Sequence, residues 1–206
     1  MNGEKHKTKL TEEQITSSLK NLRDQNLISK SIYEKLRPTG TSIPRVYGLP
    51  KVHKRDTPLG SILDMSASPY HHAARWLAES LEPVRRNTAH HSLKDIFEFV
   101  DFVKEQNTND LTMGSLDVTS LLTNIPILEC IEYLCDNITT NDLNIGIPVI
   151  NLTELLLRCT FNVQFLFDGL FYRQTDGIAM GSPFGPLLAD VFIAKLENQE
   201  LRDTIM

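Results

Sequence analysis

The sequence predicts a mixed α+β fold that is rich in helices and has a small antiparallel sheet. Apolar residues recur at helical spacing in several stretches, as at Ile15, Leu19 and Leu22. Asp168-Gly169 separates two short apolar runs and is typical of a two-residue β-hairpin turn. The small and apolar residues of 113–116, before Asp117, predict a short buried strand.

Helices account for most of the remaining chain. Thr11 and Gln14 form a capping box, and the helix that they begin is expected to reach about residue 26. Ser68-Pro69 is expected to begin another helix, and Ser92 a further one. Helical spacing also predicts later helices, over about 126–135, 152–159 and 187–196.

A basic arm is expected over 44–65. Arg45, Lys51, Lys54 and Arg55 alternate with apolar residues and one aromatic residue, and 59–65 is expected to return as the second strand of a hairpin. Such a composition suits a phosphate backbone. A simple solvated loop has the same composition, so this pattern alone leaves both interpretations open.

The length of 206 residues fits one large domain or two small ones. Residues 1–100 hold 16 Lys and Arg against 11 Asp and Glu, whereas 101–206 hold 5 against 15. This asymmetry suggests a basic surface for a polyanion beside an acidic region, although solvated charge explains it equally well. Cys130, Cys135 and Cys159 form no CxxC pair and are expected to be reduced core thiols.

The chain is expected to act inside the cell, in the nucleus or the cytoplasm. It has no apolar run long enough for a membrane span and no apolar segment of a signal peptide near the N-terminus. We therefore expect a protein that is not secreted and has no membrane partner. The sequence indicates no oligomeric state.

Asp117 follows the predicted strand and precedes a helix. An aspartate is rarely buried without a partner, and a carboxylate at the end of a strand is a plausible ligand for Mg²⁺ beside a triphosphate. An aspartate that caps a turn is the alternative.

A glycine-rich loop precedes the last predicted helix. Gly177, Gly181 and Gly185 are expected to let the backbone approach a ligand closely, and Ser182-Pro183 to set up the start of the helix. Taken alone, the loop could equally be an ordinary helix start.

Several of these segments together resemble reverse transcriptases. The stretch 115–126, SLDVTSLLTNIP, resembles the first catalytic motif of that family, and 174–189, QTDGIAMGSPFGPLLA, resembles the motif that follows it in the palm. Three upstream segments resemble the fingers, namely 36–40, 45–54 and 66–70. The sequences of these motifs are most similar to those of Penelope-like retroelements. The resemblance implies a right-hand polymerase fold with a small palm sheet. Residues 1–26 would be a helical lead-in and 27–206 a partial reverse transcriptase domain, with 27–110 fingers-like and 111–206 a partial palm.

The resemblance also implies roles for individual residues. Asp117 would bind both catalytic Mg²⁺ ions, helped by the carbonyl of Val118. Leu122 would lie beneath the incoming sugar, and Arg45 and Lys51 would approach the template or triphosphate. Gln174 and the loop of Gly181, Ser182 and Pro183 would line the nucleotide and template. The implied partners are an RNA template, a DNA primer and a deoxynucleoside triphosphate.

The sequence departs from the family pattern at three places. The family's second catalytic motif, two adjacent aspartates downstream of 174–189, does not occur before Met206. Gly60 stands where an arginine is expected to contact the triphosphate, and Leu122 where the family usually has an aromatic residue. We therefore expect a polymerase fragment truncated before its catalytic pair and inactive as this chain.

Two alternatives remain. One is a non-catalytic remnant that binds nucleic acid or a protein partner through its basic half. The other is an unrelated metal-dependent phosphoryl-transfer enzyme, in which Asp176 and Asp190 would join Asp117.

Overall fold

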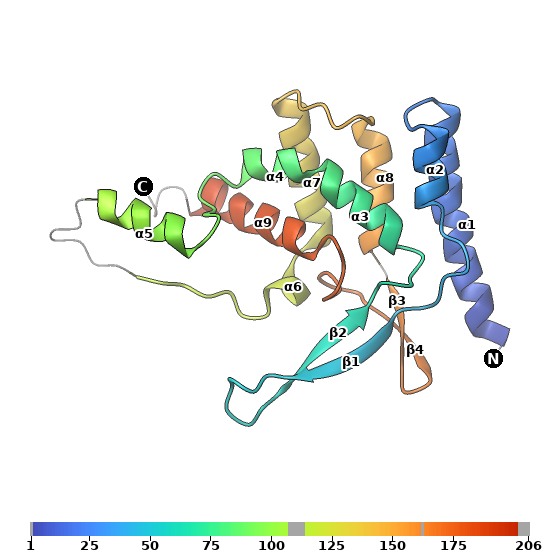
Figure 1. Cartoon of the computed structure of the whole chain (residues 1–206), viewed down its shortest axis with the longest axis horizontal. Helices are drawn as coiled ribbons and strands as arrows, with labels where there is room; N and C mark the ends of the chain where they lie inside the picture. The colour runs from blue at the N-terminus through green and yellow to red at the C-terminus, as the bar shows by residue number, and fades with distance from the viewer. Residues whose placement is uncertain (1, 107–113, 162, 202–206) are drawn as a thin grey trace.

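The computed structural model describes residues 2–106, 114–161 and 163–201, with only the backbone described for 2–7 and 200. The fold is mixed α+β, as predicted. Most of the helices form a body, and a sheet of two hairpins extends from it (Figure 1).

The N-terminal helix α1 (Asn2–Asp24) is part of this body. It packs along α8 (Val149–Thr160) and α2 (Lys30–Leu36), and its predicted apolar stripe of Ile15, Leu19 and Leu22 is fully buried. The helix begins well before Thr11, so Thr11 is not its cap. Thr11 instead lies inside the helix, where its hydroxyl is a hydrogen-bond partner of Tyr70.

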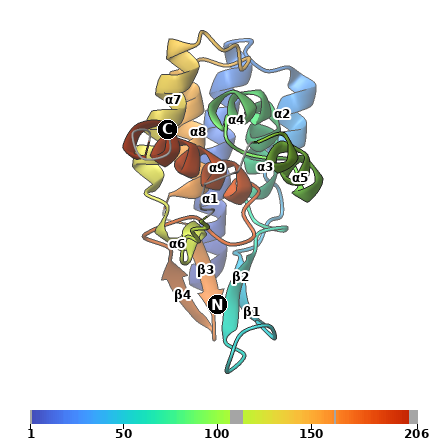
Figure 2. The same cartoon turned by 90° about the vertical axis from the view of Figure 1, so that its left-hand side faces the viewer.

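The rest of the body encloses one hydrophobic core. The helix α9 packs against α4 and α7, and α3 packs against α8 (Figure 2). These helices have the bounds α3 (His71–Ser80), α4 (Glu82–Thr88), α7 (Ile127–Thr140) and α9 (Gly185–Lys195), and a short π-helical turn, η1 (Leu196–Glu200), follows.

The sheet consists of two antiparallel hairpins. The predicted basic arm forms β1 (Arg45–Pro50) and β2 (Leu59–Asp64), and the Asp168-Gly169 turn joins β3 (Gln164–Phe167) to β4 (Leu170–Arg173). The strand order is β2-β1-β3-β4. The two hairpins meet through a parallel pairing of Arg45 with Leu166, where the Leu166 N–H donates to the Pro44 carbonyl at 2.8 Å. The sheet is therefore mixed rather than wholly antiparallel.

The strand predicted over 113–116 does not form in the residues that the structure describes. Residues 114–118 are irregular and exposed, and Leu116 is 98% exposed; Met113 lies outside the described residues. A strand needs a neighbour to pair its backbone groups, and none of the described strands lies beside this segment.

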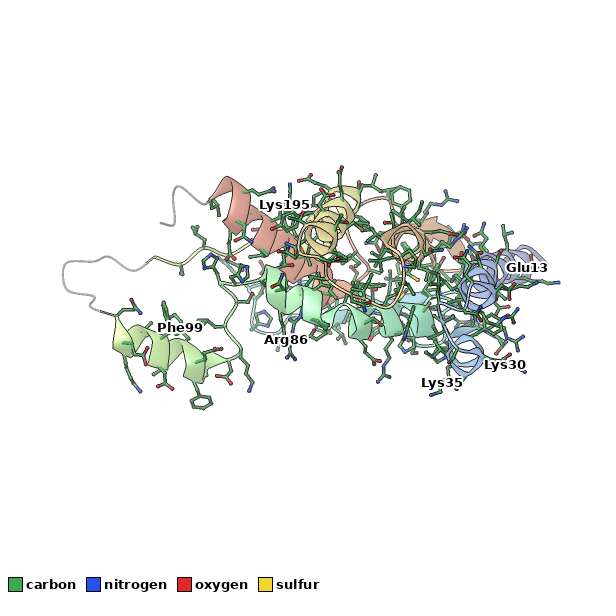
Figure 3. All side chains as sticks on the ribbon, turned by 90° about the horizontal axis from the view of Figure 1, so that it is seen from above. Glu13, Lys30, Lys35, Arg86, Phe99 and Lys195 are labelled. Atoms are coloured by element: carbon green, nitrogen blue, oxygen red, sulfur yellow. The ribbon has the colours of Figure 1, made fainter. Side chains whose placement is uncertain are left out.

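The helix before this segment, α5 (Ile96–Glu105), projects away from the body, as Phe99 shows in Figure 3. It begins three residues later than predicted from Ser92, because Asp95 is the cap. The Asp95 carboxylate accepts hydrogen bonds from the N–H groups of Phe97 and Glu98, at 2.9 and 3.0 Å.

The cysteines are core thiols, as predicted. Cys130 and Cys159 are buried and Cys135 is half-buried, and all three are free. Burial raises the pKa of the Cys130 and Cys159 thiols to about 12.

Candidate nucleic-acid interface

Segments that are far apart in the sequence meet at the loop 175–184. On one side, the Ile178 N–H donates to the Leu122 carbonyl at 2.7 Å, which ties the loop to the short helix α6 (Leu121–Asn124). On the other side, the Leu63 N–H donates to the Met180 carbonyl at 2.8 Å, which ties the loop to β2. The loop is therefore held between the segment that follows Asp117 and the basic hairpin.

The glycines of this loop are required by the protein's own backbone. Gly177 has φ 64°, and a β-carbon there would lie 2.4 Å from the carbonyl carbon and oxygen of Thr123. Gly181 has φ 107°, and a β-carbon there would lie 2.2 Å from the Leu63 carbonyl oxygen. The sequence led us to expect close approach to a ligand at these two positions, and the group that the structure places against each glycine is the backbone of the chain itself.

Four other predicted site residues lie in or beside this loop. Leu122 is half-buried and its methyl groups lie 3.7 and 3.9 Å from the position of a β-carbon on Gly185, at the start of α9. Ser182 is buried, and its hydroxyl accepts a hydrogen bond from the Phe184 N–H at 3.3 Å. Pro183 is half-buried beside it, whereas Gln174 lines a cavity described below. Ser182 therefore shapes the loop internally.

Asp117 and its neighbour Val118 lie in the exposed irregular segment before α6. Within the described ranges, no three His, Cys, Asp or Glu side chains are grouped so that they could hold a metal ion. A pair of Mg²⁺ ions requires several oxygen ligands, usually from more than one carboxylate. The described residues around Asp117 therefore do not fit that pair.

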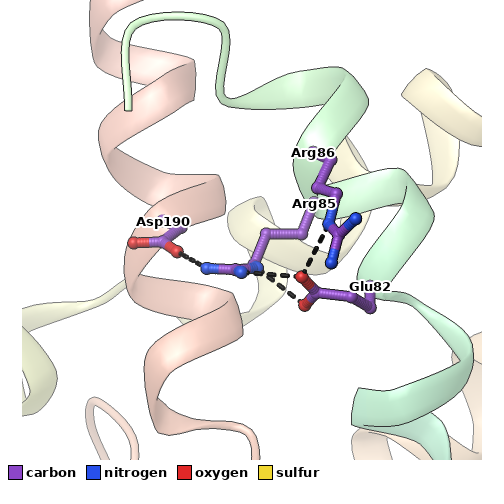
Figure 4. Close-up of polar contacts among 4 residues, drawn as sticks. All are labelled: Glu82, Arg85, Arg86 and Asp190. Atoms are coloured by element: carbon purple, nitrogen blue, oxygen red, sulfur yellow. Dashed lines mark hydrogen bonds and ion pairs between the residues drawn. The ribbon is translucent and has the colours of Figure 1, made fainter. Parts of the chain in front are cut away.

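The other two candidate carboxylates have different surroundings. Asp190 on α9 forms an ion pair with Arg85 on α4, which also binds Glu82 (Figure 4). Hydrogen bonds to Glu82 and Asp190 raise the pKa of Arg85 above its ordinary value. Asp176 is exposed and accepts a hydrogen bond from the Thr175 hydroxyl at 3.0 Å. Asp190 therefore links two helices rather than facing Asp117 in a metal site.

A cavity of about 710 Å³ lies between the two hairpins, above the loop 174–180. One wall comes from β1 and β2, the other from β3 and β4, and the floor from the loop and α6. The residues that form it include Val46, Gly48, Ser61 and Leu63 on the first wall, Phe165, Phe167, Tyr172 and Arg173 on the second, and Thr123, Gln174, Asp176, Ile178 and Met180 below.

Aromatic rings form the second wall. The rings of Phe165 and Tyr172 are stacked, with centroids 5.6 Å apart and planes inclined by 19°. Phe167 lies beyond them, 6.2 Å from Tyr172 and tilted by 58°. These residues were not predicted as a group from the sequence. The tight Asp168-Gly169 turn sets the register that places Phe165 opposite Tyr172, so the hairpin pattern contained the information needed to find them.

The arginines of the described chain fall into two groups. Those of the helices and helix ends all form ion pairs with carboxylates, namely Arg23, Arg37, Arg75, Arg85, Arg86 and Arg158. The other three, Arg45, Arg55 and Arg173, lie on the two hairpins and have no carboxylate of the described residues within ion-pair distance. Asp64, which is opposite Arg45 in the sheet, instead accepts hydrogen bonds from Ser66. The hairpins therefore present uncompensated positive charge.

Arg45 lies on the face of β1 opposite to Val46 and Gly48, because side chains alternate along a strand. Lys51 follows the end of β1, and its side chain lies beside Gly60, the partner of Leu49, on the same face as Arg45. They therefore do not line the cavity. Lys51 crosses Gly60 on the neighbouring strand, since a β-carbon at Gly60 would lie 2.8 Å from the Lys51 Cε. The Lys51 ammonium thus lies close to the position where the resemblance places an arginine.

Two further observations bear on the class of protein. Within the described ranges, no helix combines the length and the apolar character that a membrane span requires. Comparisons of the chain with protein-family models, with curated proteins and with solved structures find no match.

Proposed function

We propose that the chain binds nucleic acid as the fingers and partial palm of a polymerase of the reverse transcriptase type. We further propose that its described residues bind the strand without catalysing nucleotidyl transfer. The single observation that carries the first proposal is the grouping of unpaired arginines on the two hairpins. A surface that keeps positive charge uncompensated is suited to a polyanion such as a phosphate backbone.

The packing of the loop 175–184 supports the polymerase type. The two segments that resemble consecutive palm motifs, 115–126 and 174–189, are joined by the hydrogen bond from Ile178 to Leu122. Leu63, which lies between two of the segments that resemble the fingers, joins the same loop through the Met180 carbonyl. Such a meeting of distant motifs is expected if they serve one site. It also suits an unrelated fold that packs these segments for stability, so the assignment requires a test on nucleic acid.

Binding of a labelled primer–template at increasing salt concentrations tests the proposal. The affinity should fall steeply with salt, because each neutralised phosphate releases counterions. The triple variant Arg45→Gln, Lys54→Gln and Arg55→Gln should reduce the slope of log affinity against log salt by about 2 to 3, since each phosphate contact contributes roughly 0.7–0.9.

The matched control removes three exposed lysines of α1 and α2, with the changes Lys20→Gln, Lys30→Gln and Lys35→Gln. Both variants lose the same net charge, so only a local interface distinguishes them. An equal change of slope in the two variants would refute the placement of the interface on the hairpins. Primer extension with Mg²⁺ that disappears in Asp117→Asn would refute the non-catalytic part of the proposal.

A further inference from the structure

We propose that the cavity between the hairpins is a base-stacking site for single-stranded nucleic acid, with Phe165 and Tyr172 as its stacking wall. This inference rests on the proposed function and specifies which form of nucleic acid the site takes. It concerns the face of the sheet opposite to Arg45 and Lys51.

The wall has the geometry of a stacking platform. Phe165 and Tyr172 form a nearly parallel pair, with 19° between the ring planes, and Phe167 extends the aromatic surface. Tyr172 is 44% exposed and Phe167 is 52% exposed, although both line the cavity. Rings that are stacked yet open to solvent on a sheet provide a flat apolar surface for a further planar group.

The cavity is large enough for such a planar group and has polar atoms that can form hydrogen bonds with it. Its volume of about 710 Å³ lies in the range of small-molecule sites. On its floor the Gln174 side-chain amide donates to the Asp176 carbonyl at 3.1 Å. This bond leaves the amide oxygen of Gln174 and the carboxylate of Asp176 as acceptors, which suit the amino groups on base edges.

Charge beside the wall favours a nucleotide strand over an uncharged aromatic ligand. Arg173 follows Tyr172 on β4, but its side chain lies on the opposite face of the sheet together with Arg45, so the cations on the cavity side are those of the β1–β2 turn. Lys54 and Arg55 lie in the turn at the far end of the β1–β2 hairpin. A stacking surface flanked by cations matches the combination of base and phosphate.

The strand should be single rather than double. Bases in a duplex are already stacked on their neighbours, so their faces are closed to a protein ring unless unstacking energy is spent. An unpaired strand offers its base faces freely. The cavity should therefore bind a strand that carries bases more tightly than a strand that lacks them. The cations, in contrast, should contribute equally to the affinity for both strands, because both carry the same phosphates.

Fluorescence anisotropy with two labelled strands of about 12 nucleotides tests this inference. One strand is oligo-dC and the other has the same phosphates but abasic sites throughout. The full chain should bind the base-bearing strand about 5- to 100-fold more tightly, in keeping with one stacked base. Tyr172→Ala should remove most of this preference, and Tyr172→Phe should keep it.

Two controls separate stacking from charge and from folding. Phe171→Leu changes a ring on the same strand but on the opposite face, and should keep the base preference. The double variant Lys54→Gln and Arg55→Gln should weaken the binding of both strands by a similar factor and keep their ratio. Phe167→Ser, on the exposed part of the wall, provides a second loss-of-stacking variant if Tyr172→Ala fails to fold.

The outcomes distinguish the two proposals. Salt-dependent binding of both strands with equal affinity would overturn the stacking site and leave the proposed nucleic-acid binding intact. Folded Tyr172→Ala and Phe167→Ser variants that keep the full base preference would also overturn it. An absence of binding to either strand would overturn the proposed function itself.

Discussion

Replacing Gly177 by alanine should destabilise the protein far more than the same change at Gly40. The two glycines have almost identical backbone angles, with φ 64° at Gly177 and 66° at Gly40. An alanine at either position pays a similar left-handed backbone cost of about 1–2 kcal/mol. At Gly40 nothing lies within 4 Å of the new methyl group, so that cost is the whole effect.

At Gly177 the methyl group meets the chain itself. It would lie 2.4 Å from the Thr123 carbonyl and 2.5 Å from the Leu122 carbonyl oxygen, so the loop and α6 must separate. Such overpacking typically costs about 1–3 kcal/mol. The separation also breaks or weakens the hydrogen bond from Ile178 to Leu122, worth about 0.5–1.5 kcal/mol. Gly177→Ala should therefore be about 1.5–4.5 kcal/mol less stable than Gly40→Ala.

Urea unfolding followed by tryptophan fluorescence measures this difference. Trp76 on α3 is the single tryptophan and is half-buried in the helical body, so its emission reports loss of the core. The two variants should share the slope m and differ in midpoint. Equal free energies of unfolding for Gly177→Ala and Gly40→Ala would refute the packing of the loop against α6.

Two further predictions concern the helical body. Hydrogen bonds from Arg85, followed by those from Arg86, lower the pKa of Glu82 below its ordinary value of 4.5. The stabilising contribution of Glu82 should therefore be complete above pH 4.5 and lost as the pH falls through the lowered pKa. The difference in urea midpoint between the wild type and Glu82→Gln should accordingly be largest near neutral pH and shrink toward about pH 3, and a difference that grows on acidification would contradict this reasoning. Burial also raises the pKa of Cys130 and Cys159 to about 12, and partial burial raises the pKa of Cys135 by less. At about pH 8 Cys135 should therefore react faster with a thiol reagent than the other two cysteines in the folded protein, and all three thiols should react faster in urea. Fast modification of Cys159 in the folded protein would show that the packing of α8 differs from that described here.

Local features of this protein were predictable because their causes are local. The Asp168-Gly169 turn has φ 47° and 73°, which suits a two-residue hairpin, and the turn dipeptide alone indicated it. The buried stripe of Ile15, Leu19 and Leu22 followed from helical spacing. The burial of the cysteines followed from the apolar pattern around them.

Features that depend on distant partners required the tertiary structure. Residues 114–116 have a plausible strand composition, but strand formation depends on a neighbouring edge, and no described strand provides one. Gly177 and Gly181 were expected to let a ligand approach the backbone, and only packing showed that α6 and β2 are the segments that lie against them. Likewise, the sequence identified cations on the arm, whereas their isolation from carboxylates depends on where every acidic side chain lies. Pairing, close approach and charge compensation are properties of contacts between distant residues, and for this reason the sequence alone could not determine them.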